Sequence, residues 1–153
     1  MHLVVDFYNA YKKIASLEEN VIFHFFRYIY LLQQKFRIKK VVFAIDGKTY
    51  FKSLINSDYK KKKSELHKES FVDILQYYIL LIPNYNIIQN DRLEADDVAF
   101  CFCRDYNHCV CISEDYDWLY NLIANTNIKI YRGKHTITRD NFQPLFEIGR
   151  AHV

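Results

Sequence analysis

Short apolar runs alternate with longer apolar stretches along the chain. The short runs predict buried strands at residues 2–5, 41–45, 85–89, 109–112, 127–131 and 135–138. The longer stretches predict helices at residues 21–36, 71–82, 94–105 and 118–124. Alternating strands and helices predict an α/β fold, in which a central, mainly parallel, twisted sheet is flanked by helices on both faces.

The composition favours one compact domain. Half of the 153 residues are apolar, and 13 Tyr and 12 Phe stand against only three Gly and two Pro. A chain of this length can bury one core, and it shows no linker. Asp6 interrupts the first apolar run before it could serve as a signal peptide, and no window is apolar enough for a membrane span. We therefore expect a cytoplasmic protein.

Four cysteines form two C-x-C pairs, Cys101 with Cys103 and Cys109 with Cys111. Such a pattern can indicate a metal site or disulfides. Residues two apart point to opposite faces of a strand, or about 200° apart on a helix, so neither pair converges on one ion. We therefore predict reduced cysteines packed in the core, in preference to a zinc site.

Acidic residues stand where predicted strands end or where a predicted helix begins. They are Asp6, Asp46, Glu94, Asp96, Asp97, Asp115 and Asp117. In an open parallel sheet these positions meet at one edge. Carboxylates about 4 Å apart repel by roughly 4 kcal/mol per pair at an effective dielectric near 20, so such a cluster needs cations. Oxygen ligands favour Mg²⁺ or Mn²⁺, and two such ions can hydrolyse a phosphodiester. The alternative is that these acids are solvated turn residues and helix caps.

A basic segment lies between Lys48 and Lys68. Seven lysines, at positions 48, 52, 60, 61, 62, 63 and 68, stand here against two acids, whereas the whole chain carries a net charge of only +3. This local excess fits binding to nucleic-acid phosphates. Tyr50, Phe51 and Tyr59 are interleaved with the lysines and could stack on unpaired bases. The alternatives are that Tyr50 and Phe51 pack beneath the segment and that the lysines form a solvated loop.

Five motifs in order resemble the flap endonuclease family. They are L-V-V-D at 3–6, V-F-A-I-D-G at 42–47, Y-K-K-K-K at 59–63, E-A-D-D-V-A at 94–99 and S-E-D-Y-D at 113–117. The resemblance runs over about residues 3–146. The chain is most similar in these motifs to bacteriophage 5′-to-3′ exonucleases and to the 5′-nuclease domain of bacterial DNA polymerase I.

The resemblance implies a PIN-like 5′-nuclease domain over residues 1–147. It implies two Mg²⁺ or Mn²⁺ ions held by the seven carboxylates, and hydrolysis of DNA ends or flaps, and of RNA primers, by a two-metal-ion mechanism. It assigns catalytic roles to Lys60 and Lys63. It also implies an arch segment, about residues 48–70, through or under which a single-stranded 5′ end passes. Nucleic-acid-binding residues of that arch would be Lys48, Lys52, Tyr59, Lys60, Lys61, Lys62 and Lys63.

Three features depart from the family pattern. Phe7 and Tyr8 stand after Asp6, where bulky aromatic rings would crowd the metals. Glu114 adds a charge beside Asp115, which would tighten metal binding or misplace a ligand. The chain also ends before the glycine-rich helix-hairpin-helix region that grips the duplex in relatives. We expect a separate polypeptide as a candidate source of that region, and a tail at residues 148–153, either native or added.

Three functions fit these observations. The leading one is a 5′-to-3′ exonuclease or flap endonuclease acting on DNA. The second is a PIN-type ribonuclease acting on single-stranded RNA, because the same acids serve either substrate. The third is a non-catalytic nucleic-acid-binding subunit that needs a partner.

Overall fold

The computed structural model describes residues 1–17, 19–47, 71–106, 108–123, 125 and 127–141. The strands are β1 (His2–Asp6), β2 (Lys40–Ile45), β3 (Tyr85–Gln89), β4 (Cys109–Ile112), β5 (Ile128–Arg132) and β6 (His135–Ile137). The helices are α1 (Phe7–Leu17), α2 (Val21–Phe36), α5 (Val72–Leu81), α6 (Ala95–Asp105) and the 3₁₀ helix η1 (Tyr116–Ile123). The predictions for the arch segment, with Lys48, Lys52, Tyr59 and Lys60 to Lys63, and for the tail at 148–153 fall outside the described residues.

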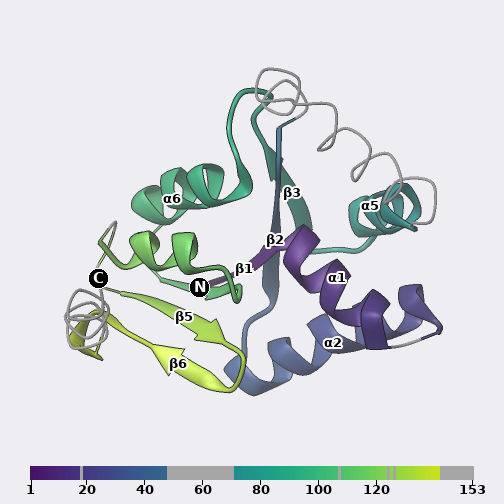
Figure 1. Ribbon diagram of the computed structural model, residues 1–153, viewed down its shortest axis with the longest axis horizontal. Coiled ribbons are helices and arrows are strands. Elements are labelled where there is room, and N and C mark those ends of the chain that lie inside the picture. Colours follow the sequence, from purple (N-terminus) through teal and green to yellow (C-terminus); the bar gives the residue numbers. More distant parts are fainter. Residues whose placement is uncertain (18, 48–70, 107, 124, 126, 142–153) are drawn as a thin grey trace.

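The six strands form one sheet in the order β3-β2-β1-β4-β5-β6 (Figure 1). Every neighbouring pair is parallel except β5 with β6. In the centre of the sheet, Val5 of β1 pairs with both Phe43 of β2 and Ile112 of β4. The carboxyl ends of these three strands therefore meet at one edge. This arrangement confirms the predicted α/β class and the mainly parallel sheet.

Helices cover both faces of the sheet. Leu3 and Val5 point into a core with α1, α2 and α5, whereas Val4 points into a second core with α6 and η1. Successive residues of a strand face opposite sides, and both sides of the central strands β1, β2 and β4 are buried, which is why these strands are almost wholly apolar. None of the described helices is long and apolar enough to cross a membrane.

The largest difference from the prediction is α1, which begins directly after β1. The sequence interpretation placed a single helix between the first two strands, but the structure has two. Phe7, Ala10, Tyr11 and Ile14 are buried at positions i, i+3, i+4 and i+7, the spacing of an amphipathic helix. Phe7 is fully buried in the core, so the expectation of bulky aromatic residues close to the metals is wrong for Phe7, whereas Tyr8 lines the pocket described below. The remaining elements agree with the prediction to within two residues, although η1 is a 3₁₀ helix.

The cysteines lie on α6 and β4. Cys103, Cys109 and Cys111 are free thiols in the core between α6 and the sheet, and the Cys103 and Cys111 sulfurs are 3.6 Å apart. The hydrogen bond with Cys103, and then burial, raise the pKa of the Cys109 thiol, so it stays protonated. Cys101 is exposed, which corrects its predicted core position. The reason is the 200° offset that separates it from the buried Cys103 on the same helix.

Candidate metal centre

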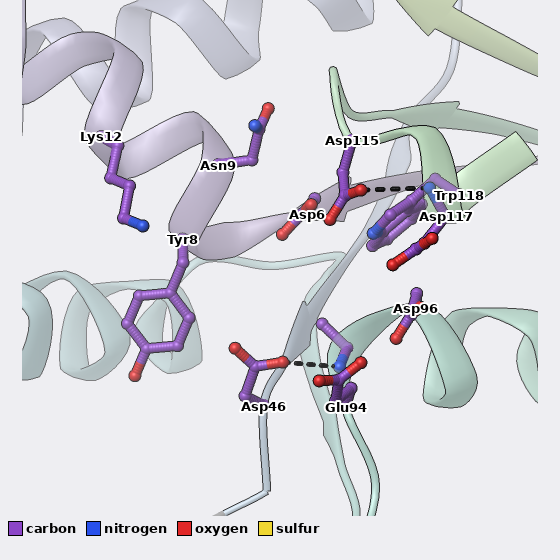
Figure 2. A pocket seen from close by; sticks show the side chains of 11 residues that line it. Asp6, Tyr8, Asn9, Lys12, Asp46, Glu94, Asp96, Asp115, Asp117 and Trp118 are labelled. Carbon is purple, nitrogen blue, oxygen red and sulfur yellow. Dashed lines mark hydrogen bonds between the residues drawn. The ribbon is translucent and has the colours of Figure 1, made fainter. Parts of the chain in front are cut away.

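A pocket opens at the carboxyl edge of the sheet, where β1, β2 and β4 end and α6 begins (Figure 2). Its volume is about 240 Å³. The lining residues are Asp6, Tyr8, Asn9, Lys12, Asp46, Glu94, Ala95, Asp96, Asp115, Asp117 and Trp118. Six of the seven predicted carboxylates therefore face the same cavity, although they come from four separate segments of the chain.

Asp97 is the predicted carboxylate that does not line this pocket. It is exposed in the first turn of α6. One carboxylate oxygen from each of Glu94, Asp96 and Asp97 nevertheless lies within 4.8 Å of the others, so these three residues form a group that could hold a metal ion. The sequence motif E-A-D-D thus supplies a compact acidic group at the start of one helix.

Asp6 is the most buried member of the cluster, with an exposed fraction of 7%. Ser113, directly after β4, donates a hydrogen bond from its hydroxyl to Asp6 Oδ2 at 2.7 Å. Burial raises the pKa of Asp6 to about 7; the Ser113 hydrogen bond opposes this shift, and the neighbouring Asp46 and Asp115 add to it. The metal-free pocket therefore favours a proton at its base.

Asp46 joins the end of β2 to the start of α6. Its Oδ1 accepts a hydrogen bond from the Ala95 backbone N–H at 2.7 Å (dashed in Figure 2), which satisfies one of the free amides at the helix N-terminus. Gly47 follows, and it donates its own N–H to Leu93 O at 2.8 Å. A Cβ at Gly47 would lie 2.0 Å from Asn90 O, so only glycine allows this close approach. These contacts fix the end of β2, which carries Asp46, against the segment before α6, which carries Glu94.

Asp96 lies half-buried in the first turn of α6. Burial, and then repulsion from Asp97 and Glu94, raise the pKa of Asp96 to about 7. A helix N-terminus favours negative charge, yet here burial and the crowding of three carboxylates outweigh that effect. The same crowding would be relieved by a divalent cation.

A tight turn after β4 sets the positions of Asp115 and Asp117. Asp115 Oδ1 accepts the backbone N–H of Asp117 at 3.0 Å, and the Asp115 N–H donates to Ser113 Oγ at 3.1 Å. Such side-chain bonds to the backbone two residues away fix an Asx-type turn. Trp118, almost fully buried, anchors the turn in the core beneath the pocket. The Asp115 and Asp117 side chains are both exposed to solvent.

Sequence reasoning had placed only Tyr8 of one wall of the pocket near the metals, and it missed Asn9 and Lys12. Tyr8, Asn9 and Lys12 project from α1 on one side of the cavity, with Glu94 and Asp96 on the other (Figure 2). Among the described residues, Lys12 is the only cation that lines the pocket. The spacing of Tyr8 and Lys12, four residues apart, would have placed them on one helix face, had α1 been recognised.

Glu114, the second residue that departs from the family pattern, does not line the pocket. Its side chain accepts a hydrogen bond from Lys13 Nζ at 3.3 Å, and its backbone N–H donates to Asn9 Oδ1 at 3.2 Å. Its charge is therefore paired outside the cavity. It ties the β4 turn to α1 instead of adding a further ligand.

A family model matches residues 3–147 of the chain, which is nearly its whole length. That model describes the N-terminal resolvase-like domain of 5′-3′ exonucleases. The chain belongs to this 5′-3′ exonuclease family. No curated protein matches the sequence at a significant level.

Solved structures with the same fold come from bacteriophage T5. The T5 5′-exonuclease with divalent zinc ions bound is 17% identical, with a TM-score of 0.62, and the match covers 94% of this chain and 60% of that one. The T5 flap endonuclease in a pseudo-enzyme-product complex with DNA and metal ions is 15% identical, also with a TM-score of 0.62, over 94% and 60% of the two chains. At these low identities, the structural similarity establishes a PIN-like fold and nothing about activity. This exonuclease-family chain spans about 60% of the length of the T5 chains.

The donor chemistry of this 5′-3′ exonuclease-family domain suits divalent cations. The acidic side chains that line the pocket all offer carboxylate oxygens, and none of the described cysteines or histidines lines it. Carboxylate oxygens are ligands for hard cations. Burial, and then repulsion from neighbouring carboxylates, raises the pKa values of Asp6 and Asp96, and a bound divalent cation would offset both effects. The acidic cluster can therefore bind divalent metal.

Proposed function

We propose that this domain is a metal-dependent 5′-to-3′ exonuclease and flap endonuclease that hydrolyses phosphodiester bonds of DNA. The observation that carries the proposal is the convergence of six carboxylates, from four chain segments, on one cavity at the carboxyl edge of the sheet. The family match over residues 3–147 supports it. The DNA and the metal ions named with the T5 flap endonuclease support the choice of substrate and cofactor.

The proposed cofactor is a pair of Mg²⁺ or Mn²⁺ ions. Asp6, Asp46, Glu94, Asp96, Asp97, Asp115 and Asp117 are the proposed ligands. Two such ions supply an activated water and stabilise the leaving oxygen of a phosphodiester. The hydrogen bonds to Asp6, Asp46 and Asp115 hold these carboxylates in place before any ion binds.

Phosphate recognition falls to the lysines. Lys12 lines the pocket opposite the acidic wall, where its ammonium can bind a phosphate oxygen of the substrate strand. Lys60 and Lys63 are proposed to stabilise the charge that develops on the scissile phosphate. Lys48, Lys52, Tyr59, Lys61 and Lys62 are proposed to hold the single-stranded 5′ end along the arch.

The test uses a labelled 5′-flap DNA duplex with Mg²⁺ or Mn²⁺, and the same duplex with EDTA. We expect metal-dependent release of the flap or of 5′ nucleotides. Asp115→Asn should abolish it, and Asp73→Asn, an exposed acid on α5 outside the pocket, is the matched control. Binding without cleavage at any metal concentration would contradict the nuclease proposal and favour a non-catalytic subunit. Faster cleavage of single-stranded RNA than of flap DNA would favour a PIN-type ribonuclease.

We also propose that firm duplex binding needs a further helix-hairpin-helix part, for which a separate polypeptide is a candidate source. The 60% coverage of the T5 chains and the family resemblance support the need for that part. Mixing the two polypeptides should raise duplex affinity, because both contact sets would then act on one substrate. Nanomolar binding of duplex DNA by this chain alone, at physiological salt, would contradict the idea.

A further inference from the structure

A tyrosine that lies in the chain between two aspartates of the pocket has a guanidinium group stacked on its ring. Tyr116 lies between Asp115 and Asp117, at the start of η1, and Arg132 ends β5. The Arg132 guanidinium carbon is 3.7 Å from the centre of the Tyr116 ring. Arg132 Nε also donates a hydrogen bond to Glu114 O at 2.9 Å, which fixes the guanidinium in place. We name this pair the Tyr116–Arg132 stack.

One face of the Tyr116 ring is open to solvent. Arg132 covers one face, yet the residue as a whole is 67% exposed. A residue with one ring face covered can be this exposed only if the opposite face of the ring is open to solvent. Tyr116 belongs to neither core cluster, so the ring contributes nothing to the buried packing.

The stack lies at the same edge of the sheet as the metal centre. Tyr131 pairs with Ile112, the last residue of β4, so Arg132 reaches one residue beyond the end of that strand. The chain then turns at Gly133, whose φ of +65° suits glycine, and presents Lys134 to solvent. Asp115 and Asp117, on either side of Tyr116 in the sequence, line the pocket. An open aromatic face and a fixed guanidinium therefore lie next to the carboxylates on the β4–β5 side, and a second cation follows in the turn after β5.

This combination of groups suits an unpaired nucleotide. Every base has a flat face that can stack on an aromatic ring, and neighbouring cations bind the phosphates without regard to sequence. A guanidinium that uses Nε for a backbone carbonyl still has its terminal N–H groups available in the geometry that matches phosphate. A duplex would not fit the ring, because its bases are already stacked on one another.

We propose that the open face of Tyr116 stacks on an unpaired base of the substrate strand directly beside the metal centre, and that Arg132 holds the ring and binds the adjoining phosphate. The proposal rests on the proposed nuclease function and names a substrate contact for it. It requires single-stranded character next to the cut. It also gives the β4–β5 side of the pocket a role in binding that is separate from the arch lysines.

The first experiment measures affinity for a fluorescent 5′-overhang oligonucleotide in EDTA, where no cleavage occurs. Tyr116→Ala should weaken binding roughly 5- to 150-fold, the range of one lost base–aromatic stack. Tyr116→Trp should bind as tightly as the wild type or more tightly. Tyr120→Ala is the matched control, because Tyr120 is also an exposed tyrosine on η1, at 59%, and none of the described cations stacks on it. Its affinity should equal that of the wild type.

The second experiment separates the phosphate contact from the stack by the salt dependence of binding. Arg132→Ala should lower the slope of log K against log salt by about 0.7, the contribution of one phosphate on a single strand. Tyr116→Ala should leave the slope unchanged. Lys129→Ala, an exposed cation earlier on β5, is the control and should change neither affinity nor slope by a comparable amount.

The third experiment locates the contact on the substrate. A 2-aminopurine placed at successive positions of the overhang should be quenched at one position in the wild type and at none in Tyr116→Ala.

Equal affinities of Tyr116→Ala and Tyr120→Ala would overturn the proposal. So would a Tyr116→Ala variant that keeps the quenching but loses Mn²⁺ affinity, because the ring would then only support Asp115 and Asp117. Failure of the wild type to bind any oligonucleotide would overturn this inference together with the nuclease function. Binding and cleavage with no effect of Tyr116→Ala would overturn this inference alone.

Discussion

The two sides of the carboxylate cluster are built in different ways. Asp6 is buried at the end of a central strand, and its hydrogen-bond partner Ser113 is 107 residues away in the sequence. Asp115 and Asp117 are exposed, and their positions are set by bonds within a few residues of the same turn. The buried side therefore depends on the whole sheet, whereas the exposed side depends on a local turn. Substitutions on the two sides should accordingly affect different properties.

The largest expected effect is on stability, from Asp6→Asn in the metal-free protein. The folded-state pKa of Asp6 is about 7 against an ordinary 3.8. Between these values the unfolded chain has lost a proton that the folded protein keeps, so the free energy of unfolding falls as pH rises. Above pH 7 this loss amounts to about 4 kcal/mol. Asp6→Asn should remove the share of the pH dependence that comes from Asp6, leave the share of Asp96, whose pKa is also about 7, and stabilise the metal-free protein by up to that amount.

Thermal denaturation in EDTA between pH 4 and 8 measures this effect. Addition of Mg²⁺ at pH 8 should raise the midpoint of the wild type more than that of Asp6→Asn, because the cation binds the ionised form. Asp117→Asn is the contrast on the exposed side and should leave most of the pH dependence intact. A wild type whose midpoint rises steadily from pH 4 to 7 would show that the sign is wrong.

The next effect is on catalysis, from Asp115→Asn on the exposed side. Loss of a metal ligand should lower kcat on flap DNA by more than about 100-fold. Substitution of a residue that only hydrogen-bonds to a ligand typically lowers activity by about 10- to 100-fold, so a larger loss would identify Asp115 as a ligand. Substrate binding should stay the same or improve, because one anion that repels DNA is gone. Single-turnover rates and affinities measured on one substrate would test this. Equal losses of rate and affinity would contradict the role.

Ser113→Ala should remove the hydrogen bonds that join the buried Asp6 to the turn that carries Asp115. It removes the donor to the buried Asp6, and an unsatisfied buried group costs about 1 to 3 kcal/mol. It should also raise the pKa of Asp6 further, because the Ser113 hydrogen bond opposes the shift. Metal affinity should fall about 10- to 100-fold. Ser16→Ala, an exposed serine bonded to Lys13 O, is the matched control, and calorimetric titration with Mn²⁺ is the measurement.

The smallest effect is expected from Lys12→Ala. One lost phosphate contact should reduce the salt slope of single-strand binding by about 0.7 and weaken binding at physiological salt several-fold. Lys13→Ala is a close control, because Lys13 is the next residue but pairs with Glu114 and does not line the pocket. If both variants lower the slope equally, Lys12 has no special place in substrate binding.

The sequence was sufficient to predict the acidic residues of the site, but it was insufficient to predict the wall of the pocket that α1 forms opposite them. Asp6, Asp46, Glu94 and Asp115 were found because strand ends and helix starts can be recognised locally, and parallel pairing brings such ends together. Asn9 and Lys12 were missed because α1 follows β1 without any turn residue, so no helix was predicted there. Both aromatic residues after Asp6 were expected close to the metals, whereas Phe7 belongs to the core and Tyr8 lines the pocket.

Side-chain contacts between distant segments could not be predicted from local patterns. The Ser113 bond to Asp6, the contact of Gly47 with Asn90 and the stack of Arg132 on Tyr116 each join residues whose approach depends on the complete sheet. The prediction for the cysteines was correct for the three buried ones. It was wrong for Cys101, because the angular offset that argued against metal binding was not applied to burial.

The central position of β1 has a consequence for how the protein folds. β1 is the first strand of the chain, yet it pairs on one side with β2 and on the other with β4, whose residues lie more than 100 positions later. Contacts between such distant positions require closure of a long loop and form slowly compared with local ones. The pairing of β1 with β4 also brings Ser113 to Asp6. Cation binding at the pocket should therefore appear only when this long-range pairing is complete, so that a refolding chain gains its secondary structure before its metal affinity.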